Sequence, residues 1–317
     1  MSTQFDVVIA GGGIAGLTAG LTSARLGRKT LVLTGDILGG QLLSINKVDG
    51  FPGFPDGIPG YDLCPIVQEQ AMSAGAEFAM EELVEIVPRD GAWRVASRTG
   101  EDYDARAVIL ATGSSLRALG VPGEERLRGK GVSHCASCDA PLMRDRVVAV
   151  IGGGDSAAQE ALTLAEFASR VIVLHRGTAL GAQAIYRDAV TQHPRIELRF
   201  NAVVEEILGD GSVMGARVRD GATGKSADMD LAGMFVYIGF RPNTEFLAGR
   251  IALDPSGQVR TDAAMRTEMA GLCAAGSVRS GWLGRAVASA GEGASAALSA
   301  DRYLGRGGSG SDAWRAD

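Results

Sequence analysis

The sequence predicts an α/β protein in which one βαβ unit with a parallel sheet occurs twice. The main observation is an internal repeat. Residues 8–33, VIAGGGIAGLTAGLTSARLGRKTLVL, align without a gap on residues 149–174, AVIGGGDSAAQEALTLAEFASRVIVL. In each copy, short apolar runs bounded by glycine have the pattern of strands, and the Ala- and Leu-rich segment between them has helical spacing. Each copy therefore predicts a strand, a glycine-rich turn, a helix and a second strand.

Length and composition limit the class of protein. A chain of 317 residues suggests about two domains of ordinary size. The net charge of -6 argues against a general nucleic-acid binder, which would carry a basic balance or a basic face. No apolar run approaches the roughly 18 residues of a membrane helix. The glycine-interrupted apolar start has no basic stretch before it, unlike a signal peptide. We therefore expect a cytoplasmic protein.

Further elements are expected around and after the two copies. A Gly/Pro-rich loop is expected over residues 50–60, and a helix from Asp62 to about Ala74. The tail over residues 305–311 has the composition of a linker. Strands are expected around Val84, Trp93–Ala96, Ala107–Ala111, Glu197–Phe200, Val213–Val218 and Met234–Ile238.

The first glycine-rich turn is Gly11-x-Gly13-x-x-Gly16, which follows an apolar run and opens the first predicted helix. In a dinucleotide-binding turn, the first glycine permits the tight turn, the second lets the backbone approach a pyrophosphate, and the third lets helix and strand pack closely. The amino end of the helix offers N–H groups and a positive dipole end to phosphates. This context favours a Rossmann-like dinucleotide site over a turn without a ligand.

The second turn is Gly152-x-Gly154-x-x-Ala157, with alanine at the third position. Two such sites in one chain are the pattern of an enzyme that binds both a flavin and a nicotinamide. Past the second strand, the sequence His175-Arg176-Gly177 has no carboxylate to accept from a ribose 2′-hydroxyl, which counts against NAD. Arg176 is a candidate ligand for the 2′-phosphate of NADP, although an arginine here can also be a surface residue.

The segment Cys135-Ala-Ser-Cys138-Asp139 contains the only close pair among the four cysteines. Neighbouring thiols in CxxC can share a disulfide, and their thiolate pKa is easily lowered at a helix amino end. A zinc site would need a second CxxC or a histidine pair, which the chain lacks. We therefore favour a redox-active pair over a zinc site or an inert disulfide. Cys64 and Cys273 are expected to pack as small hydrophobic residues.

The chain to about Leu304 resembles low-molecular-weight thioredoxin reductases. The matching segments are GGGIAG (11–16), LTGDILGGQL (33–42), PGFPDGI (52–58), ILATGSS (109–115), GKGVSHCASCD (129–139), VAVIGGGDSAAQEAL (148–162), FVYIGFRPNT (235–244) and AAGSV with SAGEGASAAL (274–298). The resemblance implies two Rossmann-like dinucleotide-binding domains, the second inserted in the first. Residues 1–114 and 241–317 would form an FAD-binding domain, and residues 115–240 a pyridine-nucleotide domain that carries the CxxC pair.

The resemblance also implies the roles of individual residues. Cys138 would react with the flavin, Cys135 would attack the disulfide of the partner, and Asp139 would be the acid–base group. Electrons would pass from NADPH through FAD to this pair, and on to thioredoxin or a similar dithiol protein. A homodimer is the usual assembly. The implied FAD-binding residues are Gly11, Gly13, Gly16, Gly39, Gly40, Gln41, Thr112, Gly113, Gly276, Ser277, Arg285 and Ala286, and the implied nicotinamide-nucleotide residues are Gly152, Gly154, Ala157 and Arg176.

The sequence departs from the family pattern at several positions. Where the family usually has the arginine run HRRxxxR, this chain has Gly177 and Gly181 in place of two arginines. Losing those contacts weakens the expected 2′-phosphate site by roughly 1.5–3 kcal/mol for each charge-assisted hydrogen bond. Ser277 replaces an aspartate near the FAD ribityl chain, Arg285 replaces a glutamine beside the flavin, and Gly50 replaces an asparagine.

Two alternative functions stay open. The weakened arginine site is compatible with a flavin disulfide oxidoreductase that does not use NADPH. Such an enzyme would take electrons from ferredoxin or another flavin, or would run in reverse as an oxygen-dependent dithiol oxidase. In some relatives that do not use pyridine nucleotides, a C-terminal aromatic covers the flavin, and Trp314 is a candidate for that role. A non-catalytic redox sensor is the other alternative, and the complete Cys-x-x-Cys-Asp segment argues against it.

Overall fold

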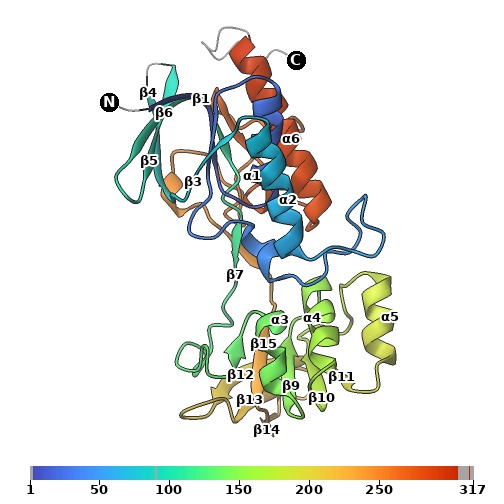
Figure 1. The fold of residues 1–317 in the computed structure, drawn as a ribbon. Coiled ribbons are helices and arrows are strands. Elements are labelled where there is room, and N and C mark those ends of the chain that lie inside the picture. The colour runs from blue at the N-terminus through green and yellow to red at the C-terminus, as the bar shows by residue number, and fades with distance from the viewer. Residues whose placement is uncertain (1–2, 90, 306–313, 315–317) are drawn as a thin grey trace. The chain divides into compact units, whose positions relative to one another are not determined.

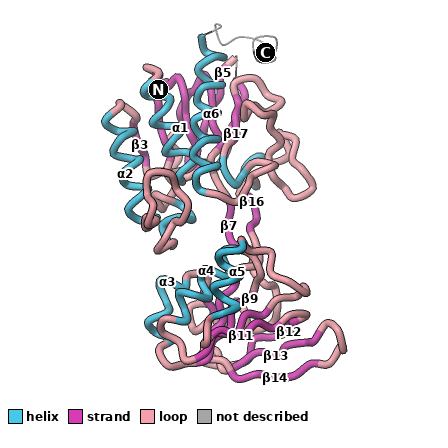
Figure 2. The backbone as a smooth tube through the Cα atoms, turned by 90° about the vertical axis from the view of Figure 1, so that its right-hand side faces the viewer, coloured by secondary structure: helices cyan, strands magenta, loops and turns pink. Residues whose placement is uncertain are grey.

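The chain divides into two compact units in the computed structural model, which describes residues 3–89, 91–305 and Trp314 (Figure 1). Unit 1 consists of Met1–Ser115 and Arg241–Asp317, and unit 2 of Leu116–Phe240. The chain passes between them through β7 (Ser114–Leu116) and β16 (Phe240–Pro242), which pair as a two-stranded sheet (Figure 2). The middle of the chain is therefore inserted in a unit formed by its two ends.

Unit 1 is built on a seven-stranded sheet with the order β3-β2-β1-β6-β5-β4, in which β17 also pairs with β6. The strands are β1 (Thr3–Ala10), β2 (Thr30–Leu33), β3 (Glu77–Ala79), β4 (Leu83–Arg89), β5 (Ala92–Ser97), β6 (Asp102–Leu110) and β17 (Leu272–Ala274). β1, β2, β3, β6 and β17 run parallel, whereas β4 and β5 join by antiparallel pairing. Helix α1 (Ile14–Arg25) packs against α2 (Gly60–Ser73) and α6 (Ala286–Gly305).

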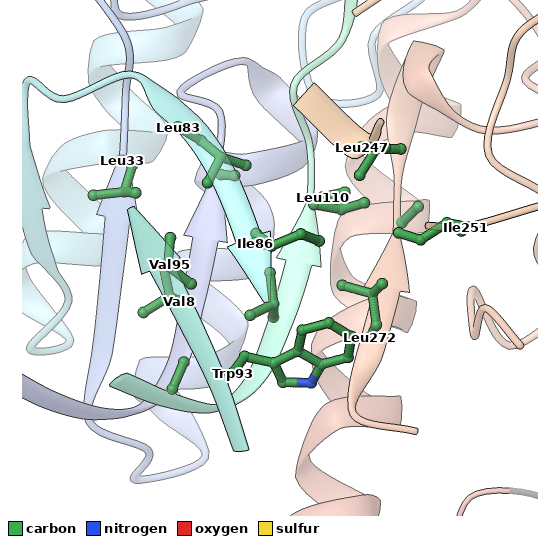
Figure 3. Close-up of a cluster of buried hydrophobic side chains, with 14 of the residues drawn as sticks. Val8, Leu33, Leu83, Ile86, Trp93, Val95, Leu110, Leu247, Ile251 and Leu272 are labelled. Atoms are coloured by element: carbon green, nitrogen blue, oxygen red, sulfur yellow. The ribbon is translucent and has the colours of Figure 1, made fainter. Parts of the chain in front are cut away.

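Both faces of this sheet are buried. In β1, Val8 belongs to a cluster that includes Trp93 and Leu110 (Figure 3), whereas Val7 and Ile9 face a second cluster that includes residues of α1 and α6. A strand buried on both faces reads as a nearly continuous apolar run rather than an alternating one, as β1 does. The sheet fixes the carboxyl ends of β1, β6 and β17 side by side, so the segments that follow these strands meet at one edge.

Unit 2 is built on a five-stranded parallel sheet with the order β11-β10-β9-β15-β8. These strands are β8 (Val132–Ser133), β9 (Val147–Ile151), β10 (Arg170–Leu174), β11 (Ile196–Arg199) and β15 (Gly233–Val236). A separate antiparallel sheet contains β12 (Ala202–Leu208), β13 (Gly215–Asp220) and β14 (Ser226–Asp230). The helices are α3 (Ala136–Asp139), α4 (Asp155–Ala165) and α5 (Ala184–Gln192). Short 3₁₀ turns are η1 (Gly40–Ser44), η2 (Ala140–Met143), η3 (Glu245–Leu247) and η4 (Gly276–Val278).

The internal repeat is confirmed in both units. The first copy forms β1, α1 and β2, and the second forms β9, α4 and β10, each with parallel strand pairing. The helix expected from Asp62 begins at Gly60. The strand expected from Val213 begins at Gly215, because the Val213 amide instead donates to the Lys130 carbonyl. The linker-like tail lies outside the described residues after Gly305.

The described residues contain no helix with the length and apolar character needed to cross a membrane. They also contain no group of three or more His, Cys, Asp or Glu side chains placed to hold a metal ion. Cys64 and Cys273 are free thiols without solvent exposure, which confirms that they pack as small hydrophobic residues. Burial raises the pKa of the Cys64 thiol to about 11, so this group stays protonated and unreactive near neutral pH.

Candidate active site

The first glycine-rich turn leaves the amino end of α1 open. Gly13 is the N-cap, no side chain caps the helix, and its first turn carries no acidic residue. A Cβ atom on Gly11 would lie 2.1 Å from the Ala111 carbonyl oxygen, and one on Gly16 would lie 1.8 Å from the Gly11 carbonyl oxygen. A Cβ atom on Gly13 would meet no described atom within 4 Å. Gly11 and Gly16 are thus required by the fold, whereas Gly13 borders free space at the positive end of the helix.

The segment after β2 lies beside this turn. Gly39 donates its amide to the Gly12 carbonyl at 2.9 Å, and a Cβ atom on Gly40 would lie 3.5 Å from the Gly13 Cα atom. Gly39 and Gly40 both have positive φ, at 94° and 55°, a region that favours glycine. The Gln41 side chain donates to the Ser114 carbonyl at 2.9 Å. The structure therefore brings together the first turn, the start of η1 and the start of β7.

The residues after β6 and β17 complete this edge of unit 1. The hydroxyl groups of Ser114 and Ser277 are 2.8 Å apart, and a Cβ atom on Gly113 would lie 3.7 Å from the Ser277 hydroxyl. A Cβ atom on Gly276 would lie 3.0 Å from the Ala15 Cβ atom on α1, which places η4 against the first turn. Ala286 packs in the cluster that contains Ile14. Arg285 is exposed and donates to the Gly284 carbonyl.

Together these residues form a site suited to a dinucleotide. Uncapped N–H groups, absence of acidic side chains in the first turn of α1, and a glycine that borders free space are the features by which a helix amino end accepts a pyrophosphate. The Ser277 hydroxyl supplies a neutral polar group at this edge. The expected FAD-binding residues other than Arg285, which is exposed, thus lie at one edge of one sheet.

The second turn, in unit 2, has a different electrostatic character. Gly154 is the uncapped N-cap of α4, but Asp155 lies in the first turn of this helix. The Asp155 carboxylate accepts hydrogen bonds from the backbone and the side chain of Gln183, at 2.7 and 2.9 Å. The Gly181 amide donates to the Gly153 carbonyl at 2.8 Å, so the loop before α5 folds over this turn. A negative charge and a closely packed loop make this site a weaker anion site than the first.

The remaining predicted residues of the second turn have clear positions. A Cβ atom on Gly152 would lie 2.2 Å from the Tyr237 carbonyl oxygen and 2.9 Å from the Ala157 Cβ atom, which explains the small residues at both positions. The His175 ring lies under Gly153, where a Cβ atom would be 2.4 Å from its Nδ1. Arg176 is exposed. The turn is therefore formed as expected, and Arg176 lies at the surface.

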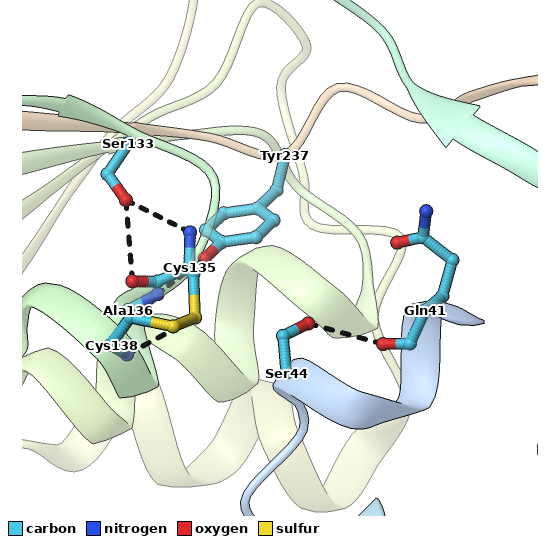
Figure 4. The surroundings of a disulfide bond; sticks show 7 residues. All are labelled: Gln41, Ser44, Ser133, Cys135, Ala136, Cys138 and Tyr237. Atoms are coloured by element: carbon cyan, nitrogen blue, oxygen red, sulfur yellow. Dashed lines mark hydrogen bonds between the residues drawn. A yellow bond between two sulfur atoms is a disulfide. The ribbon is translucent and has the colours of Figure 1, made fainter. Parts of the chain in front are cut away.

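The two active-site cysteines form a disulfide at the start of α3 (Figure 4). Cys135 is the N-cap of this helix, and its sulfur accepts a hydrogen bond from the Cys138 amide at 3.2 Å. The Ser133 hydroxyl accepts from the Cys135 amide at 3.0 Å and fixes the approach to the helix. Cys135 is half-buried, whereas Cys138 is exposed. An amide directed at the Cys135 sulfur stabilises a thiolate at that position more than at Cys138.

A tyrosine and a glutamate lie beneath this disulfide. The Tyr237 hydroxyl accepts a hydrogen bond from the Ala136 amide at 3.0 Å (Figure 4). Glu160 of α4 is 6% exposed, and burial raises the pKa of its carboxyl to about 7, against the opposing effect of the Ala136 amide and the Tyr237 hydroxyl. Burial and the nearby Glu160 carboxyl also raise the pKa of Tyr237 above its usual range. Tyr237 is therefore a neutral hydrogen-bonding group under the redox pair.

Sequence reasoning did not select these two residues, although Glu160 left a signal. Glu160 stands three residues after Ala157 and four before Leu164, a spacing that places all three on the buried face of α4. Glutamate is rarely buried in a protein core, so a glutamate at such a position points to a specific role. Asn243 was also missed. Its side-chain amide donates to the Thr112 carbonyl, and it accepts from the Ser115 hydroxyl, so it ties together the segments next to β7 and β16.

Trp314, the candidate flavin cover, packs in the core of unit 1. Its indole N–H donates to the Thr267 carbonyl at 2.8 Å, and its ring packs edge-to-face on Tyr303 with 5.3 Å between centroids. Thr267 in turn bonds to Leu272, the first residue of β17, whereas Gly276 follows the carboxyl end of this strand. Trp314 is therefore buried in the core of unit 1, next to the amino end of β17.

A model of the family described as pyridine nucleotide-disulphide oxidoreductase matches residues 5–293 of the chain. The chain belongs to this family. Within the family it is similar to a thioredoxin reductase of Peptoclostridium acidaminophilum, with 38% identity over 310 residues that cover 96% of this chain and 98% of the relative. Identity to a thioredoxin reductase of Mycolicibacterium smegmatis is 39% over 303 residues, with coverage of 95% and 97%. The crystal structure of Lactococcus lactis thioredoxin reductase matches with a TM-score of 0.93 and 33% identity, over 95% of this chain and 99% of that one.

These similarities confirm the resemblance to low-molecular-weight thioredoxin reductases and the α/β fold with two Rossmann-like sheets. The chain is an enzyme, a thioredoxin reductase-like flavin disulfide oxidoreductase with a CxxC pair at Cys135 and Cys138. The alternative of a non-catalytic redox sensor is therefore wrong.

Proposed function

We propose that this enzyme passes electrons from NADPH through FAD to the Cys135–Cys138 disulfide, and from there to thioredoxin or a similar dithiol protein. In this proposal the residues 1–114 and 241–317 bind FAD, and residues 115–240 bind the nicotinamide nucleotide. The single observation that carries the proposal is the disulfide at the start of α3, in the unit that also contains the second glycine turn. FAD, NADPH and thioredoxin are the usual cofactors and partner of the thioredoxin reductases that the chain resembles.

The residues that would hold FAD are those of the open edge of unit 1. The α1 amino end at Gly13, with Gly39 and Gly40 beside it, would receive the pyrophosphate, and Ser277 would bond to the ribityl region. When bound, FAD would accept a hydride from a nicotinamide nucleotide and pass the two electrons to a disulfide. Arg285 would lie at the flavin end of the site, where its positive charge would favour an anionic reduced flavin.

The two cysteines have distinct proposed roles. Electrons enter at the Cys138 sulfur, which is exposed, and the S–S bond breaks so that Cys135 leaves as a thiolate. The Cys138 amide, 3.2 Å from the Cys135 sulfur, supports this assignment because it stabilises the leaving thiolate. The Cys135 thiolate then attacks the disulfide of the partner, and Cys138 resolves the mixed disulfide. Asp139, at the end of α3, would donate and accept the accompanying proton.

Several residues around the second glycine-rich turn favour a second candidate for the electron donor. Arg176 is exposed, Gly177 and Gly181 replace two arginines of the family pattern, and Asp155 carries a negative charge into the second turn. These features weaken the site for a 2′-phosphate. They favour, as the second candidate, an enzyme of the same chemistry that takes electrons from ferredoxin or another flavin, or that oxidises dithiols. We propose a homodimer in the cytoplasm, as the usual setting of such an enzyme.

An anaerobic experiment tests the donor. The purified enzyme is mixed with NADPH or NADH while the flavin absorption band is recorded, and oxidised thioredoxin is then added. The proposal predicts rapid bleaching by NADPH and recovery of the band on addition of thioredoxin. Bleaching by dithionite but by neither nucleotide would refute NADPH as donor and favour the second candidate. Bleaching by NADPH without recovery would refute thioredoxin as acceptor.

A further inference from the structure

A buried carboxyl group beneath the redox disulfide has no part in the electron route described above. Glu160 lies on the face of α4 that also carries Ala157, Ala161 and Leu164, all of them buried. Its carboxyl interacts with the Tyr237 hydroxyl and the Ala136 amide. Its Oε2 atom is buried and has no hydrogen-bond partner among the described residues. A carboxylate with an unpartnered oxygen is costly to bury, so this environment favours the protonated acid.

Tyr237 connects this carboxyl to the redox pair. The Tyr237 hydroxyl accepts from the Ala136 amide at 3.0 Å, and that amide belongs to the peptide unit that begins at Cys135 (Figure 4). The Cys135 sulfur is held in turn by the Cys138 amide. Only one hydroxyl and one peptide unit therefore separate the Glu160 carboxyl from the residue proposed to become a thiolate. A negative charge on either group disfavours a negative charge on the other.

The elements packed against α4 carry charged groups of their own. On α3, Asp139 is the one carboxylate, and its negative charge acts on Tyr237. On β10 and β11, Arg170, Glu197 and Arg199 are exposed or partly exposed and form ion pairs with one another. On α5, Tyr186 packs in the hydrophobic core that α4 shares. Burial raises the pKa of Glu160 to about 7, so its charge changes near neutral pH.

We propose that Glu160 acts through Tyr237 as a positioning residue that couples proton uptake to reduction of the Cys135–Cys138 disulfide. Two electrons break the S–S bond, Cys135 becomes a thiolate, and Cys138 takes up one proton to become a thiol. The new charge on Cys135 makes Glu160 bind its proton more tightly. Near neutral pH, reduction therefore takes up a further fraction of a proton at Glu160, and oxidation releases it. This inference deepens the proposed function and rests on it only for the redox activity of the cysteine pair.

The test is the midpoint potential of the disulfide as a function of pH. The full-length purified enzyme is equilibrated in dithiothreitol redox buffers between about pH 6 and 9, and the thiols at Cys135 and Cys138 are counted by alkylation and mass spectrometry. We expect the potential of the wild type to fall more steeply with pH than that of Glu160→Gln above about pH 7, where the carboxyl ionises in the oxidised enzyme. Glu166→Gln, which removes an exposed carboxylate at the end of the same helix, is the matched control and should follow the wild type.

Equal slopes for the wild type and Glu160→Gln would overturn the proposal. If Glu160→Gln does not fold, the same measurement on Tyr237→Phe decides, because this variant keeps the carboxyl but removes the hydroxyl through which Glu160 is proposed to act. An unchanged slope in Tyr237→Phe would then overturn the proposal, and a shallower slope would support it. A merely structural role of either residue would change stability without changing the pH slope. Neither nucleotide nor thioredoxin enters this experiment, so its failure and a failure of the proposed donor or acceptor are distinguishable.

Discussion

Substitution by alanine should have opposite effects on stability at Gly13 and at Gly16. In Gly16→Ala, the added Cβ atom would lie 1.8 Å from the Gly11 carbonyl oxygen, so backbone must move. Overpacking of this kind costs about 1–3 kcal/mol or more of the free energy of unfolding. In Gly13→Ala, the added atom meets no described atom within 4 Å, and φ is -75°, a value that alanine adopts freely. We expect the free energy of unfolding of the flavin-free Gly13→Ala protein to lie within about 1 kcal/mol of the wild-type value.

Although Gly13→Ala should leave the stability of the flavin-free protein nearly unchanged, we expect it to weaken FAD binding strongly. If the pyrophosphate approaches the backbone at Gly13, the methyl group blocks the approach. The loss of even one charge-assisted hydrogen bond, roughly 1.5–3 kcal/mol, weakens FAD binding about 10- to 150-fold. The assay combines urea unfolding of the flavin-free protein with a calorimetric titration of FAD. Wild-type FAD affinity in Gly13→Ala would refute the assignment of the first turn, and a large loss of flavin-free stability in this variant would refute the packing argument.

Two further predictions concern unit 2. Because the pKa of Glu160 rises from 4.5 to about 7 on folding, the folded chain binds more protons than the unfolded chain between these values. The free energy of unfolding of the wild type should therefore fall by about 3 kcal/mol relative to that of Glu160→Gln as pH rises from about 4.5 to 8. A difference between the two proteins that stays constant with pH, measured by urea unfolding, would contradict this. Separately, Gly181→Arg restores an arginine of the family pattern, at a position where a Cβ atom meets only the Gly153 carbonyl, at 3.8 Å. It should lower the KM for NADPH at least about 10-fold and leave that for NADH unchanged. Thr178→Arg is the exposed control, and an equal change for both nucleotides would contradict specific 2′-phosphate binding.

The sequence predicted the framework well because local pattern and tertiary structure agree there. The two glycine turns require strand, turn and helix at fixed spacing, and close contacts such as that between Gly16 and the Gly11 carbonyl make those glycines necessary. The candidate FAD residues of unit 1 lie together because parallel strands bring their carboxyl ends to one edge of the sheet. The antiparallel strands β12 and β14 went unnoticed because β14 is short and largely exposed, and two adjacent glutamates, Glu205 and Glu206, interrupt the apolar run of β12.

The sequence did not predict the interactions that depend on tertiary contacts. Glu160 and Tyr237 are far apart in the chain, and only the fold places both against Ala136. Asp155 reads as an ordinary first-turn acid, but its pairing with Gln183 depends on the loop before α5. Trp314 was considered as a flavin cover by analogy, whereas its contacts with Tyr303 and Thr267 make it part of the core.

An anaerobic reductive titration tests the central claim, that electrons pass from flavin to Cys138 and Cys135. Dithionite is added stepwise to the wild type and to Cys138→Ser while the flavin band is recorded, and the cysteines are alkylated at each step. The wild type should consume about twice as much reductant per flavin as Cys138→Ser, with thiols appearing at Cys135 and Cys138 as the flavin is reduced. Equal consumption by the two proteins, or a disulfide that stays intact when the flavin is fully reduced, would contradict the claim.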